Sequence, residues 1–117
     1  MHNYKELLVW KKAIALATQI YQISGDFPDT EKFGLVSQMR RSVISISSNI
    51  AEGAGRRTDK EFAHFLGISH ASVCELESQL HVCKELQLVN EEDFLSVANS
   101  LSEVQRILFS LIRKFDN

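Results

Sequence analysis

The sequence predicts an all-α protein, an antiparallel up-down-up-down four-helix bundle in which residues 1–117 form one domain. Three observations support this fold class. Pro28 is the only proline and just five glycines are present, so the chain has few places to turn and long helices are favoured. Apolar residues alternate at spacings of three and four along four segments, which gives each segment one apolar face. The connections are short, so these faces can be buried only against one another.

The first helix is expected at about residues 4–24. Asn3 is a suitable N-cap, with Glu6 three residues later in the capping-box position. Ser24 and Gly25 end the helix, and the segment around Pro28 turns the chain. The stripe expected to face the core consists of Leu7, Trp10, Ile14, Ala17 and Tyr21. A second apolar stripe beside it consists of Ala13, Leu16, Ile20 and Ile23.

The second helix is expected at about residues 30–53, with its start near Asp29 or Thr30. Its core stripe consists of Val36, Met39, Val43, Ile46 and Ile50. Residues 43–47 alternate between apolar and polar as a strand would, but the longer helical spacing favours a helix. Gly53 and Gly55 are expected to end it.

The third and fourth helices are expected at about residues 58–87 and 90–115. Thr58 and Glu61 form the capping-box pattern, and Asn90 precedes three acidic residues that suit the positive end of a helix dipole. The third core stripe consists of Phe62, Leu66, Ser69, Val73, Leu76, Leu80 and Cys83. The fourth consists of Phe94, Val97, Leu101, Val104, Leu108, Leu111 and Phe115.

Several apolar residues remain beside these stripes. They are Ala13, Leu16, Ile20, Phe65, Ile68, Ile107 and Ile112. Two interpretations stay open. The residues widen the buried stripes, as is common in globular bundles, or they form an interface between subunits.

A specific string of residues runs from Ile20 to Leu80, with SNIAEGAGRR at Ser48–Arg57 as its centre and ELLVWKKA near the start of the chain. In this string the chain resembles the four helix bundle protein family, whose members are encoded within intervening sequences of bacterial 23S ribosomal RNA genes. The resemblance covers nearly the whole chain. It implies a bacterial four-helix bundle that assembles as a ring-like homopentamer and whose biochemical role is not defined.

A related group of proteins serves as the accessory proteins of diversity-generating retroelements. Those proteins resemble this chain in fold, are strongly basic, and bind nucleic acid and a reverse transcriptase. The present chain departs from them, because its net charge is −2, and this departure weakens any transfer of nucleic-acid binding. The charge is uneven, however: residues 1–60 carry +3 and residues 61–117 carry −5.

Basic residues in the first half are the candidate contacts to RNA or DNA. The second helix carries Arg40 and Arg41 at its middle, off the core stripe, and the following turn carries Arg56, Arg57 and Lys60. In a ring these groups would be repeated about the axis, so that weak phosphate contacts add up. The competing interpretation is that they are solvated charges or pair with nearby acidic residues.

Three residues of the SNIAEG string are interpreted as structural. Asn49 is expected to bond across helices or to cap the turn, Glu52 to hold Arg56 or Arg57, and Gly53 to end the helix. The serines of the second helix allow close helix approach and have no accompanying base. A helix-turn-helix centred on Gly67 is disfavoured, because the core stripe passes through it without a change of phase.

Four potential metal ligands share one helical stripe, namely His70, Cys74, Glu77 and His81. The ends of this stripe are ~16 Å apart, so the four cannot bind one ion. A di-iron bundle needs two Glu-x-x-His pairs facing inward, whereas the chain has one, off the core stripe. We therefore expect no metal, no cofactor and no catalytic residue.

The expected location is a reducing cytoplasm, without membrane contact. No apolar run reaches the ~18 residues of a membrane span. Cys74 and Cys83 lie nine positions apart on one helix and cannot form a disulfide with each other. The sequence thus favours a non-enzymatic, oligomeric bundle that contacts RNA or DNA. The alternative is a protein–protein interaction scaffold that binds no nucleic acid.

Overall fold

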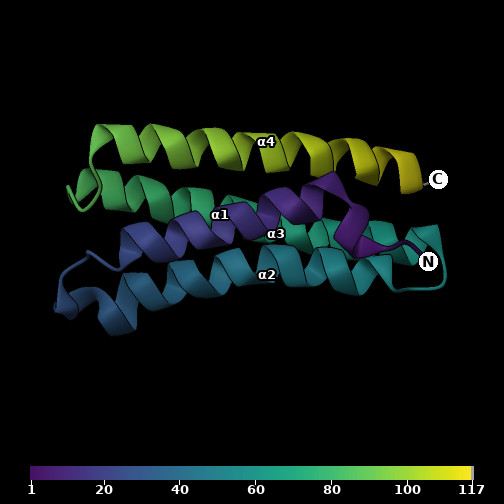
Figure 1. The fold of residues 1–117 in the computed structure, drawn as a ribbon, viewed down its shortest axis with the longest axis horizontal. Helices are drawn as coiled ribbons and strands as arrows, with labels where there is room; N and C mark the ends of the chain where they lie inside the picture. The colour runs from purple at the N-terminus through teal and green to yellow at the C-terminus, as the bar shows by residue number, and fades with distance from the viewer. Residues whose placement is uncertain (117) are drawn as a thin grey trace.

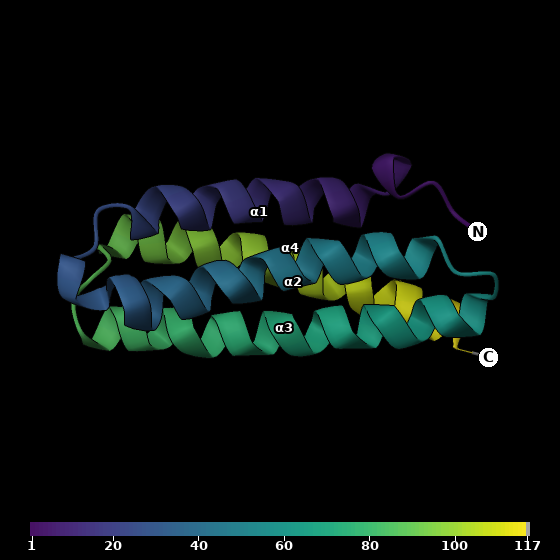
Figure 2. The ribbon, with the colours of Figure 1, turned by 90° about the horizontal axis from the view of Figure 1, so that it is seen from below.

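The computed structural model describes residues 1–116, which form four α-helices and contain no β-strand. The helices are α1 (Leu8–Ser24), α2 (Ser37–Ala54), α3 (Asp59–Glu85) and α4 (Glu91–Phe115). Their axes lie side by side in a rod of 44 × 23 × 20 Å (Figures 1 and 2). Each helix packs against two others, in the cyclic order α1, α2, α3, α4.

The connections gather at the two ends of the rod. Both termini and the α2–α3 turn lie at one end, whereas the α1–α2 and α3–α4 connections lie at the opposite end (Figure 1). Because the helices bury apolar faces along their whole length, the core is one continuous column. Among residues 1–116, no helix has the length and hydropathy that crossing a bilayer requires.

The N-terminal segment corrects the predicted start of the first helix. Residues Tyr4–Glu6 form a separate 3-10 turn, η1, and Leu7 has extended backbone angles (φ −73°, ψ 125°) before α1 begins. Asn3 caps η1, because its side chain accepts a hydrogen bond of 3.2 Å from the Lys5 N–H. The predicted N-cap is therefore confirmed for this short turn and not for α1.

The prediction of the core-facing side of the first helix was partly wrong, because only Ala17 of the five predicted residues is buried. Ile14 and Tyr21, predicted to be buried, are 40% and 42% exposed. Their places in the core are taken by the second stripe, in which Ala13, Leu16 and Ile20 are fully buried. The two stripes lie beside each other on the helix and both are apolar, so their spacing does not decide between them. Those three residues are consequently not available as a subunit interface.

The second helix begins later than predicted. Asp29–Glu31 form a 3-10 turn, η2, and Lys32–Val36 form a π-helical turn, η3, in which Gly34 has non-helical angles (φ −107°, ψ −107°). Gly34 interrupts the helical conformation at this point, so regular α2 starts only at Ser37. At the other end, Gly53 lies inside the helix, and Gly55 is the C-cap.

The third and fourth helices match the prediction closely. Thr58 caps α3 by accepting from the Glu61 N–H at 3.1 Å, and Asn90 caps α4 by accepting from the Asp93 N–H at 2.7 Å. All seven predicted core positions of α3 are buried, as are the first five of α4. The α3 helix passes through Gly67 without a break, which excludes a helix-turn-helix there.

Small residues bring α2 and α3 close together. A Cβ atom added to Gly53 would lie 2.6 Å from Cβ of Phe65, so any larger residue would force the two helices apart. Hydroxyl groups complete this interface. Ser69 donates to the Ile46 carbonyl at 2.9 Å, and Ser45 and Ser72 bond to each other at 2.8 Å. The expectation that serines permit close approach is confirmed at this interface.

Candidate nucleic-acid interface

Charge is separated along the long axis of the molecule. The end that carries both termini, residues 1–12, 52–61 and 106–116, holds nine Lys/Arg and five Asp/Glu, a net charge of +4. The opposite end, residues 25–36 and 84–93, holds two Lys/Arg and seven Asp/Glu, a net charge of −5. We call these the basic end and the acidic end. The total of −2 therefore conceals a strong gradient along the rod.

The five predicted basic residues do not form one site. Arg40 and Arg41 lie in the first turns of α2, not at its middle, because the helix starts only at Ser37. Arg56, Arg57 and Lys60 lie beyond the other end of α2. Fifteen residues separate the two groups, or ~22 Å at the rise of an α-helix. Only the second group belongs to the basic end.

Arg40 is occupied within the subunit. Its guanidinium donates to Ser24 Oγ at 3.0 Å and to the Tyr21 carbonyl at 3.2 Å, and it lies 4.5 Å from the centre of the Tyr21 ring. A cation bonded to the last carbonyls of a helix stabilises the helix end. Arg40 thus fastens α2 to the end of α1. Arg41 is exposed and has no polar partner within residues 1–116.

The basic residues at the α2–α3 turn differ in how freely they can bind. Arg56 pairs with Glu52 at 3.0 Å, one of the two partners expected for that carboxylate, and lies 4.7 Å from the centre of the Phe65 ring. Arg57 and Lys60 are exposed, and no polar group in the described part of the chain engages them. Their charges are therefore available to an external anion.

Asn49 acts within its own helix. Its Nδ2 donates to the Ser45 carbonyl at 2.8 Å and lies 3.1 Å from Ser45 Oγ, which in turn bonds to Ser72 of α3. It neither crosses to another helix directly nor caps the turn. Together with the close contact at Gly53, these bonds give the SNIAEG string a structural role, to set the distance between α2 and α3.

His2 is a residue of the basic end that the sequence did not indicate. Its backbone N–H donates to the Ala54 carbonyl at 2.8 Å, and its Nε2 lies 3.0 Å from Oδ1 of Asp59. Its ring packs against Phe62 and Phe115, with centroids 4.9 and 5.1 Å away, and those two rings also contact each other. The partners are more than fifty positions distant in the sequence, so no local pattern could have predicted these contacts.

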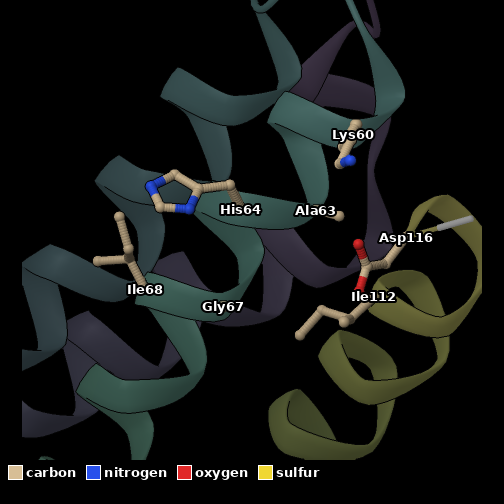
Figure 3. A pocket seen from close by; sticks show the side chains of 7 residues that line it. All are labelled: Lys60, Ala63, His64, Gly67, Ile68, Ile112 and Asp116. Carbon is tan, nitrogen blue, oxygen red and sulfur yellow. The ribbon is translucent and has the colours of Figure 1, made fainter.

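Two open depressions lie between α3 and α4. The first, of about 510 Å³, lies over Gly67 (Figure 3). Its other lining residues are Lys60, Ala63, His64 and Ile68 of α3, Ile112 of α4 and the following Asp116. The second, of about 480 Å³, is lined by His70, Gln105, Arg106, Phe109 and Ser110. Both are wide hollows in the surface rather than enclosed cavities, and the first adjoins the basic end.

The potential metal ligands are not gathered into a site. Within residues 1–116, no three His, Cys, Asp or Glu side chains are placed to hold one ion. Cys74 and His70 lie 4.0 Å apart on the surface of α3. Burial, with a further contribution from the nearby negative charge of Glu31, raises the pKa of the Cys83 thiol to about 11. This thiol is therefore neutral at physiological pH and points into the core.

Comparison with a solved structure supports the fold, and comparison with a family model shows the family. A solved structure from Bacteroides thetaiotaomicron, described as a protein of unknown function from the S23 ribosomal protein family, superposes with a TM-score of 0.84. It is 24% identical to this chain, and the match covers 90% of this chain and 98% of that one. Among curated proteins, none matches the sequence. The family model described as 23S rRNA-intervening sequence protein matches residues 5–110. This chain therefore belongs to the 23S rRNA-intervening sequence protein family.

Proposed function

We propose that the protein is a non-enzymatic, cytoplasmic, ring-like homo-oligomer of up-down-up-down bundles that contacts the phosphates of RNA or DNA through its basic end. The observation that carries this proposal is the gradient of charge along the rod, with Arg57 and Lys60 exposed and unpaired at the positive end. Phosphate contacts are the main source of affinity in nucleic-acid binding and need no enclosed pocket. A protein of net charge −2 can bind a polyanion if it presents only that end.

Assembly multiplies this weak contact. If the bundles stand side by side around an axis parallel to their length, all basic ends lie on one face of the ring. Each subunit then adds its own phosphate contacts, and the combined affinity exceeds that of one subunit by orders of magnitude. The acidic ends lie on the opposite face, where they repel nucleic acid. Such a ring binds from one side only.

An apolar face between α1 and α2 supports the assembly. Ile14 and Tyr21 are seven residues apart and so lie on the same side of α1, next to the half-buried Trp10. Ile44 lies one turn after Arg40, the residue that contacts Tyr21, and is 43% exposed. Apolar and aromatic groups of this kind are enriched at subunit interfaces. The family resemblance implies five subunits, which native mass spectrometry of the purified protein tests directly.

The interior gives no support to catalysis. The buried polar side chains are serines, and Ser24, Ser42, Ser47, Ser69 and Ser72 are each hydrogen-bonded within the bundle. A nucleophilic serine needs a base within hydrogen-bond reach that is itself oriented by a third group. Ser42 contacts the Glu75 carboxylate at 3.1 Å, but no histidine is part of that contact.

The experiment is a titration of RNA against the purified oligomer at several salt concentrations. The test variant is Arg57→Glu with Lys60→Glu, and the matched control is Arg41→Glu, which reverses an exposed, unpaired arginine outside the basic end. Arg40 is left unchanged because it fastens α1 to α2. We expect the wild type and the control to bind with an affinity that falls with salt, and the double variant to lose binding. Equal binding by the double variant, or none by the wild type at low salt, contradicts the proposal.

A protein-interaction scaffold is the second candidate, and the acidic end favours it. Phe33 is 89% exposed on the π-helical turn, and Leu86 is 57% exposed on the neighbouring connection. Exposed apolar groups among acidic residues suit a basic partner protein. If the wild type binds no RNA at 50 mM salt or below, capture of a protein that is lost in Phe33→Ala and kept in Arg57→Glu supports this alternative.

A further inference from the structure

Gly67 occupies a position where nothing inside the subunit requires a glycine. It lies within the 27-residue helix α3 and is exposed, and a Cβ atom built on it would meet no heavy atom within 4 Å. In this it is the opposite of Gly53, whose Cβ would collide with Phe65. Apart from proline, glycine is the residue least favourable to a helix interior. The missing side chain leaves the depression of about 510 Å³ open to an external group (Figure 3).

The second depression continues the first along the same two helices. His70 follows Gly67 by three residues on α3, and Phe109 precedes Ile112 by three residues on α4. Each step of three residues is slightly less than one helical turn and rises ~4.5 Å along the axis. Phe109 is 57% exposed, so more than half of this large aromatic side chain is open to solvent. The two depressions therefore lie close enough together for two successive units of a short polymer to occupy them.

The side chains around these two depressions are polar and mainly positive. Lys60 lines the first depression and Arg106 the second, and the Arg113 guanidinium lies 5.8 Å from the centre of the Phe109 ring. Asp116 is the carboxylate that lines the first depression, where it can accept a hydrogen bond from an exocyclic amino group. An apolar floor with cationic edges fits a ligand that carries flat aromatic rings on an anionic chain.

We propose that the α3–α4 face binds single-stranded nucleic acid, with one unstacked base in the depression over Gly67 and the next base against Phe109. Lys60 and Arg106 contact the phosphates beside these bases. This inference rests on the proposed function and deepens it, because it names a strand with free bases as the ligand. A duplex keeps its bases paired and stacked, so it reaches only the phosphate contacts of the basic end.

A second copy of the chain is the competing occupant of the depression over Gly67. The rim argues against it, because charged residues are depleted from the centres of subunit interfaces, whereas Lys60 and Asp116 line this depression together with its apolar residues (Figure 3). The α1–α2 face offers larger exposed apolar side chains to a second copy, Ile14 and Tyr21. If a second copy occupied the depression, Gly67→Leu would change the mass of the oligomer.

Gly67→Leu places a side chain in the first depression, and its Cβ would meet no heavy atom within 4 Å. Phe109→Ala removes the second stacking surface. The matched control is Ser78→Leu, which adds the same side chain at an exposed position of α3, ~16 Å further along the helix. The probes are a 12-nucleotide RNA without secondary structure and the duplex of the same sequence, each measured against the intact oligomer.

We expect Gly67→Leu and Phe109→Ala each to weaken binding of the single strand by about tenfold while duplex binding stays within about twofold, because base stacking is lost and phosphate contact is kept. Ser78→Leu binds both probes as the wild type does. Unchanged binding of the single strand by Gly67→Leu overturns the inference, and so does a changed oligomer mass in that variant. Binding of neither probe by the wild type refutes the proposed function itself.

Discussion

The two ends of the bundle differ in how the chain turns and in what covers the turn. At the basic end, α2 passes into α3 through residues 55–58, and His2 packs over this end against Phe62 and Phe115. At the acidic end, twelve residues from Gly25 to Val36 make the turn, and Phe33 is left in solvent. The positive side chains are therefore presented from the more tightly packed end, which fixes their relative positions. The long turn at the acidic end is less well covered by other side chains.

The largest effect is expected from filling the tight contact at the basic end. Gly53→Ala places a methyl group 2.6 Å from Cβ of Phe65, which forces α2 and α3 apart and lowers the free energy of unfolding by about 2–3 kcal/mol. Gly55→Ala is the control, since Gly55 has a φ of −81° and its added Cβ would meet only carbonyl oxygens at 3.6 Å or more. Urea denaturation of both variants measures the difference. Equal stability of the two would show that the basic end is no more tightly packed than an ordinary helix terminus.

The second prediction concerns how stability at the acidic end depends on pH. It involves the Cys83 thiol, which lies in the last turns of α3. Because burial raises its pKa from the ordinary value of 9.0 to about 11, folding favours the protonated thiol. The protonated thiol therefore stabilises the folded state fully below pH 9. This stabilisation is lost as the pH rises towards 11, at a rate of up to about 1.4 kcal/mol for each pH unit. Thermal melting between pH 8 and 11 should show this slope in the wild type and not in Cys83→Ala. Parallel slopes would mean that the acidic end admits water to Cys83.

A smaller effect, an increase in the free energy of unfolding, is expected at the α3–α4 connection. Gln87 has a φ of 58°, and the N–H of Leu88 bonds back to the Cys83 carbonyl at 2.9 Å, as in a Schellman helix end. A residue with a Cβ is strained in this left-handed conformation, so Gln87→Gly raises the free energy of unfolding by about 1 kcal/mol. Glu85→Gly, two residues earlier in regular helix, should lower it by a similar amount. Chemical denaturation of the pair checks the contrast, and a loss of stability in Gln87→Gly contradicts it.

The parts of the fold that the sequence predicted depend on local patterns. The core stripes of α2, α3 and α4 were found because each had a single apolar face, and Thr58 and Asn90 were found because capping involves residues three positions apart. The first helix failed because two apolar stripes compete, and burial of Leu16 rather than Ile14 depends on the packing of the other helices. The late start of α2 follows from the conformation of Gly34, which spacing does not reveal.

The candidate site was predicted less completely, because a site depends on distances between segments. The sequence indicated Arg57 and Lys60 as charges, but it also grouped them with Arg40, which the structure shows bonded to the end of α1. The gradient of charge along the rod became visible only when the segments were placed at their ends. The depression over Gly67 has no local signal beyond a glycine in an otherwise regular helical pattern.

The π-helical turn at Lys32–Val36 has an evolutionary consequence. The buried Val36 ends this turn and Met39 is the first buried residue of α2, so the chain before them can gain or lose a residue without rotating the buried side of α2. Gly34 kinks the chain inside this turn, so the segment is not held in the register of a regular helix. Related chains are therefore expected to vary in length at this place, and to keep a constant length from Ser37 to Ala54, where one insertion would turn every following side chain by about 100°.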